Sequence, residues 1–209
     1  MLTERDYRIS LASCALSVLL LLGGCGGKSP ALPALDKTAV VLAFGDSLTF
    51  GTGAAPEQAY PAQLAQVIGR EVVNQGVPGE ISQDGLTRLP AVLDEFKPRL
   101  LILCHGGNDF LRKLDSKATE ANLRAMVKLA QARNIGVLLM ATPQPGIILS
   151  VPAFYETIGK ELGVPVEAAV LAKVLRDNAL KSDLVHPNAA GYSRIADTLV
   201  QTLKRAGAV

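Results

Sequence analysis

The strongest pattern in the chain is a set of three near-continuous apolar runs of strand length, at Ala39–Phe44, Arg99–Cys104 and Ile135–Ala141. Weaker runs of the same kind occur at Glu71–Asn74 and Val164–Val166. Runs that are apolar on both faces are typical of parallel strands that helices cover on either side. The pattern therefore predicts a central, mostly parallel sheet of five strands.

Helical periodicity alternates with these runs. Before the third strong run, apolar residues recur at helical spacing at Leu123, Met126, Val127 and Ala130. Near the end of the chain, the same spacing occurs at Ile195, Leu199 and Leu203. Pro187-Asn188 is expected to begin the last helix. Strands that alternate with helices predict an α/β fold, a three-layer α/β/α sandwich. Active sites in such folds form outside the carboxyl ends of the strands, so Ser47 and Asn108 are expected on one rim.

The N-terminal residues form a separate segment. Arg5 and Arg8 precede the apolar stretch Ile9–Leu22. As a helix this stretch would span about 21 Å, whereas the hydrocarbon core of a bilayer is about 30 Å thick. A secretory signal is therefore favoured over a transmembrane helix. Leu22-Gly23-Gly24-Cys25 resembles a bacterial lipobox, which implies a signal peptide at residues 1–24 and lipidation of Cys25.

Residues 25–37 resemble a flexible tether, and residues 38–209 would then form the folded domain. Gly26 after the cysteine resembles lipoproteins sorted to the outer membrane of a Gram-negative host, which implies an envelope protein that faces the periplasm and is attached to the membrane through its lipid. Glu4 and Asp6 depart from the positive charge expected of a signal. An ordinary signal peptide with an incidental cysteine is therefore the alternative.

Composition narrows the class of protein. The chain has 209 residues, 49% of them hydrophobic, which suits one well-buried domain better than two. Its 21 basic and 19 acidic residues leave a net charge of +2, and no basic run exceeds two residues, so nucleic-acid binding is not indicated. Two histidines and the one cysteine left after the signal, Cys104, do not form a metal motif. We expect no cofactor, and a monomer.

Two polar segments far apart in the chain supply the parts of a hydrolytic triad. Gly45-Asp46-Ser47-Leu48 follows the first apolar run, and Asp183-Leu184-Val185-His186 lies near the end. A serine hydroxyl becomes a good nucleophile when an imidazole takes its proton and a carboxylate fixes the tautomer of that imidazole. Ser47 is thus the candidate nucleophile, with His186 as base and Asp183 as its orienting acid.

Each of these roles has a rival. His105 directly follows a buried run, where a histidine more often packs or orders a loop than acts as a base, although it could line the pocket. Asp46 is next to the nucleophile and cannot easily reach behind the imidazole, so we interpret it as ordering the turn at Ser47.

Four sequence blocks together resemble the GDSL (SGNH) hydrolase family. In chain order they are Gly45-Asp46-Ser47-Leu48, Asn74-Gln75-Gly76-Val77-Pro78-Gly79, Gly106-Gly107-Asn108-Asp109 and Asp183-Leu184-Val185-His186-Pro187. One block alone is common, whereas four in family order and spacing are specific. Within the family, the chain is similar to bacterial periplasmic enzymes with arylesterase, thioesterase and lysophospholipase activity. The resemblance implies a flavodoxin-like SGNH hydrolase fold and the same triad.

The resemblance also assigns an oxyanion hole, made of the Ser47 and Gly79 amides and the Asn108 side chain. Asn108 follows two glycines, which let a small ligand approach the backbone closely. The alternative is an asparagine that only forms a turn. Ile81 stands where the family often has a hydroxyl, which leaves open whether Gly79 or Gly76 provides the amide.

The sequence therefore predicts a serine esterase of carboxylic (acyl or aryl) esters, with lysophospholipids or acyl thioesters as further candidate substrates. The alternatives are an O-acetylesterase of envelope or extracellular polysaccharide and a non-catalytic lipoprotein that binds a lipid or a partner. We expect residues 110–116, the loop 143–150 and Phe154 or Tyr155 to build the substrate pocket.

Overall fold

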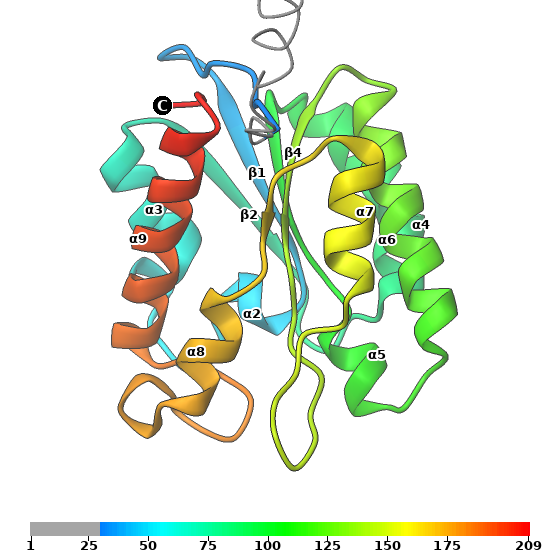
Figure 1. Ribbon diagram of the computed structural model, residues 1–209. Coiled ribbons are helices and arrows are strands. Elements are labelled where there is room, and N and C mark those ends of the chain that lie inside the picture. Colours follow the sequence, from blue (N-terminus) through cyan, green and yellow to red (C-terminus); the bar gives the residue numbers. More distant parts are fainter. Residues whose placement is uncertain (1–29) are drawn as a thin grey trace, which may run out of the picture.

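A five-stranded parallel sheet forms the centre of the protein (Figure 1). The computed structural model describes residues 30–209, so the predicted signal peptide and Cys25 lie outside the described residues. The sheet order is β2-β1-β3-β4-β5. The strands span Val40–Gly45 (β1), Glu71–Gly76 (β2), Leu100–Cys104 (β3), Gly136–Met140 (β4) and Val166–Glu167 (β5). The predicted α/β fold is confirmed.

Helices cover both faces of this sheet. The α-helices are α2 (Ser47–Phe50), α3 (Tyr60–Ile68), α4 (Ser82–Phe96), α5 (Gly107–Leu111), α6 (Ser116–Gln131), α7 (Phe154–Leu162), α8 (Val170–Arg176) and α9 (Ala189–Arg205), with 3-10 turns at Pro56–Gln58 and Asn178–Leu180. In Figure 1, α3, α8 and α9 lie on the left and α4, α6 and α7 on the right. Asn188 caps α9, as expected, because its side chain accepts from the Gly191 N–H at 3.1 Å.

Alternation along the strands divides the core into two clusters. Val41 and Ala43 pack with α3, α8 and α9, whereas Leu42 and Phe44 pack with α4, α6 and α7. Successive side chains of a strand point to opposite faces, so a strand covered on both sides must be apolar throughout. This explains why β1, β3 and β4 gave the strong sequence signals.

The two edge strands gave weaker signals for identifiable reasons. β2 pairs with β1 alone and is partly exposed along its length, so its side chains need not all be apolar. β5 begins two residues later than predicted, at Val166. Pro165 lacks an N–H and enters the sheet only through its carbonyl, which accepts from Leu139 N–H at 3.0 Å.

The folded part of the chain includes residues that the sequence analysis placed in the tether. Leu32 and Leu35 are buried in the core cluster on the α9 side. Their N–H groups donate to Ala206 O and Ala208 O, both at 2.9 Å. The folded domain therefore begins before residue 38, the predicted boundary. Removing these two leucine side chains from water stabilises the folded state. Among the described residues, no helix has both the length and the hydrophobicity needed to cross a membrane.

Replacing both Leu32 and Leu35 with alanine should destabilise the domain. Each buried leucine truncated to alanine costs at least about 2 kcal/mol, so the pair should lower the free energy of unfolding by about 4 kcal/mol in urea denaturation. Lys37→Ala, at an exposed position of the same segment, should change it by less than about 0.5 kcal/mol. Equal stability of the wild type and the double variant would show that the segment is not part of the folded domain.

Candidate active site

Ser47 stands at the carboxyl end of β1, at the point where the sheet order reverses. β1 lies between β2 and β3, and the crevice outside such a reversal is the usual ligand site of an open parallel sheet. Ser47 is the first residue of α2, and Asp46 caps this short helix by accepting from Leu48 N–H at 3.0 Å. The cap fixes the sharp turn from strand to helix and presents the Ser47 side chain on the rim.

His186 and Asp183 lie beside Ser47 in the structure, although they are far from it in the sequence. His186 Nε2 lies 3.0 Å from Ser47 Oγ, and His186 Nδ1 lies 2.8 Å from Asp183 Oδ2. Burial acts to raise the pKa of Asp183, but the hydrogen bond with His186 and bonds from the backbone lower it overall. Asp183 is therefore ionised near neutral pH, as an imidazole-orienting acid must be.

The loop that carries Asp183 and His186 is held by its own hydrogen bonds. Asp183 Oδ1 accepts from the N–H groups of Val185 and His186, both at 2.8 Å. Ser182 N–H donates to His186 O at 2.9 Å, and the Asn188 side chain donates to Ala179 O at 2.9 Å. These bonds set the imidazole before any ligand arrives.

Asn108 reaches the same rim from the loop after β3. Gly106 has a φ of +112°, a conformation that favours glycine, and Asn108 lies in the short helix α5 that follows. Its Nδ2 donates to Glu80 O at 3.0 Å and to Asp46 Oδ2 at 3.3 Å. Two hydrogen bonds thus fix the Asn108 side chain beside the turn at Ser47.

Gly79 rather than Gly76 lies at the site. Gly79 lines the same pocket as Ser47 and Asn108. Gly76 is the last residue of β2, and its N–H donates to Asn74 Oδ1 at 3.0 Å. Because that amide already has an acceptor inside the protein, the geometry favours Gly79 as the free donor.

The two rival residues occupy other positions. Asp46 is buried beneath the turn at Ser47, which it orders, and burial raises the pKa of its carboxyl group. His105 is fully buried and does not line the pocket. Neither of its ring nitrogens makes a well-oriented hydrogen bond with a described residue, although Nε2 lies 3.0 Å from Glu80 Oε2. His105 is therefore a packed residue behind the site.

An apolar pocket of about 330 Å³ opens beside these groups, within the range of small-molecule sites. The predicted loops supply Leu111, Pro143, Pro145 and Leu149, and the further apolar wall comes from Leu175, Leu184 and Val185. Phe110 and Tyr155 are instead buried in the core, and neither they nor Phe154 line the pocket.

Sequence reasoning missed Leu175 and Leu184. Leu184 is 84% exposed and stands between Asp183 and His186, so its place in the catalytic block was a usable signal. Leu175 comes from α8, and no local pattern marks it.

Neither a metal centre nor a reactive thiol is present in the described part of the chain. Within residues 30–209, no group of three His, Cys, Asp or Glu side chains could hold a metal ion. Cys104 is buried at the end of β3, and burial raises the pKa of its thiol far above the usual range. The thiol is thus not a competing nucleophile.

Comparison with known proteins places the chain among ester hydrolases. Residues 43–194 match the model of the GDSL-like Lipase/Acylhydrolase family. The chain is 33% identical over 172 residues to Thioesterase 1/protease 1/lysophospholipase L1 of Escherichia coli, covering 78% of this chain and 83% of that protein. It is 31% identical over 201 residues to Esterase TesA of Pseudomonas aeruginosa, covering 88% and 97%.

Solved structures agree with this placement. The crystal structure of TesA superposes with a TM-score of 0.71 at 29% identity, covering 80% of this chain and 99% of that one. The psychrotrophic esterase EstA of Pseudoalteromonas sp. superposes with a TM-score of 0.72 at 24% identity, covering 79% and 97%. The second likeness concerns the fold alone.

A fluorophosphonate probe should label Ser47, because its Oγ lies 3.0 Å from an imidazole nitrogen that can take its proton. Mass spectrometry of the digested protein would locate the adduct. His186→Gln should slow labelling by at least about a hundredfold, whereas Ser116→Ala, at an exposed position, should label like the wild type. Labelling that persists in Ser47→Ala would point to another nucleophile.

Proposed function

The chain belongs to the GDSL-like lipase/acylhydrolase family of ester hydrolases, and we propose that it is a serine esterase whose triad is Ser47, His186 and Asp183. The observation that carries this proposal is the continuous series of contacts from Ser47 Oγ to His186 Nε2 at 3.0 Å and from His186 Nδ1 to Asp183 Oδ2 at 2.8 Å. A nucleophile, a base and an orienting acid in this order are what acyl transfer to water requires.

The proposed reaction has two halves. Ser47 Oγ attacks the ester carbonyl carbon while His186 Nε2 takes the hydroxyl proton. The tetrahedral intermediate then expels the alcohol, which receives that proton from His186, and leaves an acyl-enzyme. In the second half His186 takes a proton from water, the resulting hydroxide attacks the acyl carbon, and Ser47 leaves with the proton. Asp183 stays ionised throughout and stabilises the imidazolium.

The oxyanion of each intermediate would accept hydrogen bonds from the Ser47 and Gly79 amides and from Asn108 Nδ2. Asn108 has two acceptors at rest, and its contact with Asp46 Oδ2, at 3.3 Å, is the longer one. In this proposal the oxyanion takes the place of that contact. Such a donor is worth about 3 kcal/mol of transition-state stabilisation.

The apolar pocket supports esters with an apolar acyl or aryl group as substrates. Its wall is formed mainly by leucine and proline side chains, which offer an alkyl chain or ring a dry surface but offer a sugar few hydrogen bonds. The relatives named for thioesterase, lysophospholipase and arylesterase activity point to the same substrate class. Acyl thioesters and lysophospholipids are therefore included in the proposal.

Hydrolysis of p-nitrophenyl esters from acetate to palmitate tests this function. Ser47→Ala should abolish activity, and Asp183→Asn should lower kcat by about 10⁴-fold because the imidazole loses its orienting acid. Ser116→Ala is the control and should retain activity. Burying one CH₂ contributes about 0.8 kcal/mol, so kcat/KM should rise up to about fourfold per methylene until the pocket is filled. Activity on acetylated sugars alone would instead support the polysaccharide deacetylase, and no Ser47-dependent activity would support a binding lipoprotein.

We also propose that the enzyme is an envelope lipoprotein attached through Cys25, at the outer membrane and facing the periplasm. The described chain enters the domain at Leu32, beside Ala206 at the C-terminal end of α9, whereas Asn188 and His186 stand at the N-terminal end of α9. A helix of this length spans about 25 Å. In this proposal the pocket faces away from the membrane that holds the anchor, toward substrates in the aqueous phase.

Detergent partitioning of the full chain, expressed in a Gram-negative host, tests the anchor. The wild type should enter the detergent phase, because acyl chains add about 0.8 kcal/mol of binding per buried CH₂, and Cys25→Ala should move the protein to the aqueous phase. Cys14→Ala is the matched control and should behave like the wild type. Wild-type protein found only in the aqueous phase would favour an ordinary signal peptide.

A further inference from the structure

We propose that Glu80 is a positioning residue for the oxyanion hole. Its buried side chain is held from behind the site, and its own backbone then fixes both Asn108 and the turn that contains Gly79. This inference rests on the proposed function, since it assigns a role within the same reaction.

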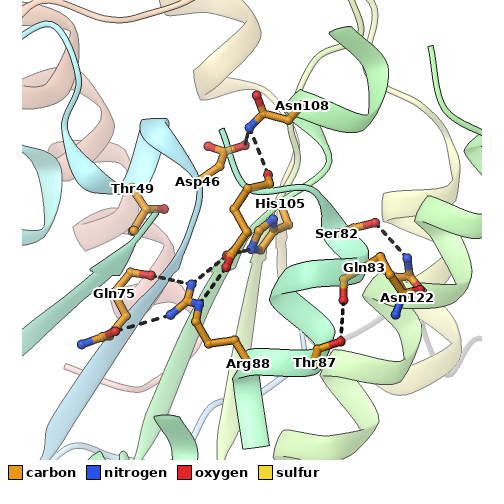
Figure 2. A network of polar contacts seen from close by, with 12 residues as sticks. Asp46, Thr49, Gln75, Ser82, Gln83, Thr87, Arg88, His105, Asn108 and Asn122 are labelled. Atoms are coloured by element: carbon orange, nitrogen blue, oxygen red, sulfur yellow. Dashed lines mark hydrogen bonds and ion pairs between the residues drawn. The ribbon is translucent and has the colours of Figure 1, made fainter. Parts of the chain in front are cut away.

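Two neighbouring side chains hold the carboxylate of Glu80. Arg88 donates to both carboxylate oxygens, from Nε to Oε1 at 2.8 Å and from Nη2 to Oε2 at 2.7 Å. His105 Nε2 lies 3.0 Å from Oε2. A guanidinium that binds both oxygens fixes the orientation of a carboxylate as well as its position. Figure 2 shows Arg88 and His105 in the same polar network, with Asn108 and Asp46 above them.

The partners of Glu80 are themselves anchored in the scaffold. Arg88 lies in α4, donates to Gln75 O of β2 at 3.1 Å and stacks over the Phe44 ring of β1 at 4.1 Å. His105 follows β3 and is fully buried. A Cβ placed on Gly85 of α4 would lie 2.5 Å from His105 Nε2, so the helix can approach this close only with a glycine there. The carboxylate therefore joins α4 to the ends of three strands.

The main chain of Glu80 faces the site. Its carbonyl accepts from Asn108 Nδ2 at 3.0 Å, and its N–H closes a turn onto Val77 O at 3.1 Å. Gly79, at the third position of that turn, has a φ of +80°, as a type II turn with Pro78 and Gly79 at its centre requires. One residue thus sets the place of the Asn108 amide group and of the Gly79 N–H.

The ionisation state of Glu80 supports its role as a positioning residue. Burial alone would raise the pKa of Glu80, but the bonds from Arg88 and the contact with His105 outweigh it and hold the pKa at about 2. The carboxylate is therefore ionised at any pH at which an imidazole base works. The ion pair of Glu80 with Arg88 therefore persists whether or not the His186 imidazole carries a proton.

The experiment measures kcat and KM for p-nitrophenyl butyrate in Glu80→Gln and in a matched control, Glu161→Gln. Glu161 also binds an arginine, Arg124, through two contacts at 3.1 and 2.8 Å, but on α6 and α7 away from the pocket. Displacing reacting groups by about 1 Å can cost about a hundredfold in rate. Glu80→Gln should lower kcat by about 10- to 100-fold with KM within about twofold, and Glu161→Gln should change neither.

A double-mutant cycle separates positioning from general loosening of the fold. If Glu80 acts through the oxyanion donors, adding Glu80→Gln to Asn108→Ala should cost less than about threefold, because the main group that it positions is gone. A full, additive loss in the double variant, or a KM that rises with the loss of kcat, would overturn the proposal.

Arg88→Lys is the second variant, for the case that Glu80→Gln does not fold. It keeps the charge but loses the two-point contact, so it should show a smaller loss of kcat, again with KM unchanged; unchanged kcat would contradict the proposal. If the wild type itself shows no Ser47-dependent hydrolysis, the proposed function fails, and this outcome is distinct from an active wild type with an unaffected Glu80→Gln.

Discussion

The parallel register of β1 with its two neighbours is the constraint on which the site depends. Gly45 pairs with Gly76 of β2 and with Cys104 of β3, so three strands end at the same level. A Cβ at Gly45 would lie 2.2 Å from Cys104 O, which shows how closely β1 and β3 approach. Because the strands end together, the segments that follow them start side by side. Ser47, Gly79 and Asn108 meet on one rim for this reason.

A layer of buried polar groups supports that rim from below. Asp46 binds the turn at Ser47 and the Asn108 side chain, and Glu80 binds Arg88. Asp109, the neighbour of Asn108, accepts from the Ser82 backbone N–H at 2.9 Å and from its hydroxyl at 2.6 Å. A buried polar group left without a partner costs free energy comparable to a lost hydrogen bond, so each pairing fixes the relative place of two loops. The side chains of the candidate site are thereby placed before a ligand binds.

The pocket wall follows a different rule. Leu149 comes from the connection between β4 and α7, in which Ile147 and Ile148 are exposed. Loops of this kind can change without disturbing the sheet. Relatives of the chain carry names for thioesterase, lysophospholipase and arylesterase activity, which is consistent with a pocket wall that varies while the sheet stays the same.

Much of this protein could be predicted from local patterns. Apolar runs identified β1, β3 and β4 because both faces of a central strand are buried, and the four blocks marked Ser47, Gly79, Asn108 and His186 as candidates because catalysis needs particular functional groups. The edge strands and the start of the domain were less clear, since partial burial leaves a weak pattern and Leu32 and Leu35 find their partners at the far end of the chain.

Only the tertiary structure decided which of the candidates meet. Ser47 and His186 stand 139 positions apart, and spacing alone does not tell which of two histidines reaches the serine. The assignment of His105 to the buried layer, of Gly79 rather than Gly76 to the pocket and of Glu80 to the support of Asn108 followed from contacts between distant segments. Sequence determines the functional groups and the strands, whereas the register of the sheet and the packing of the loops determine their distances.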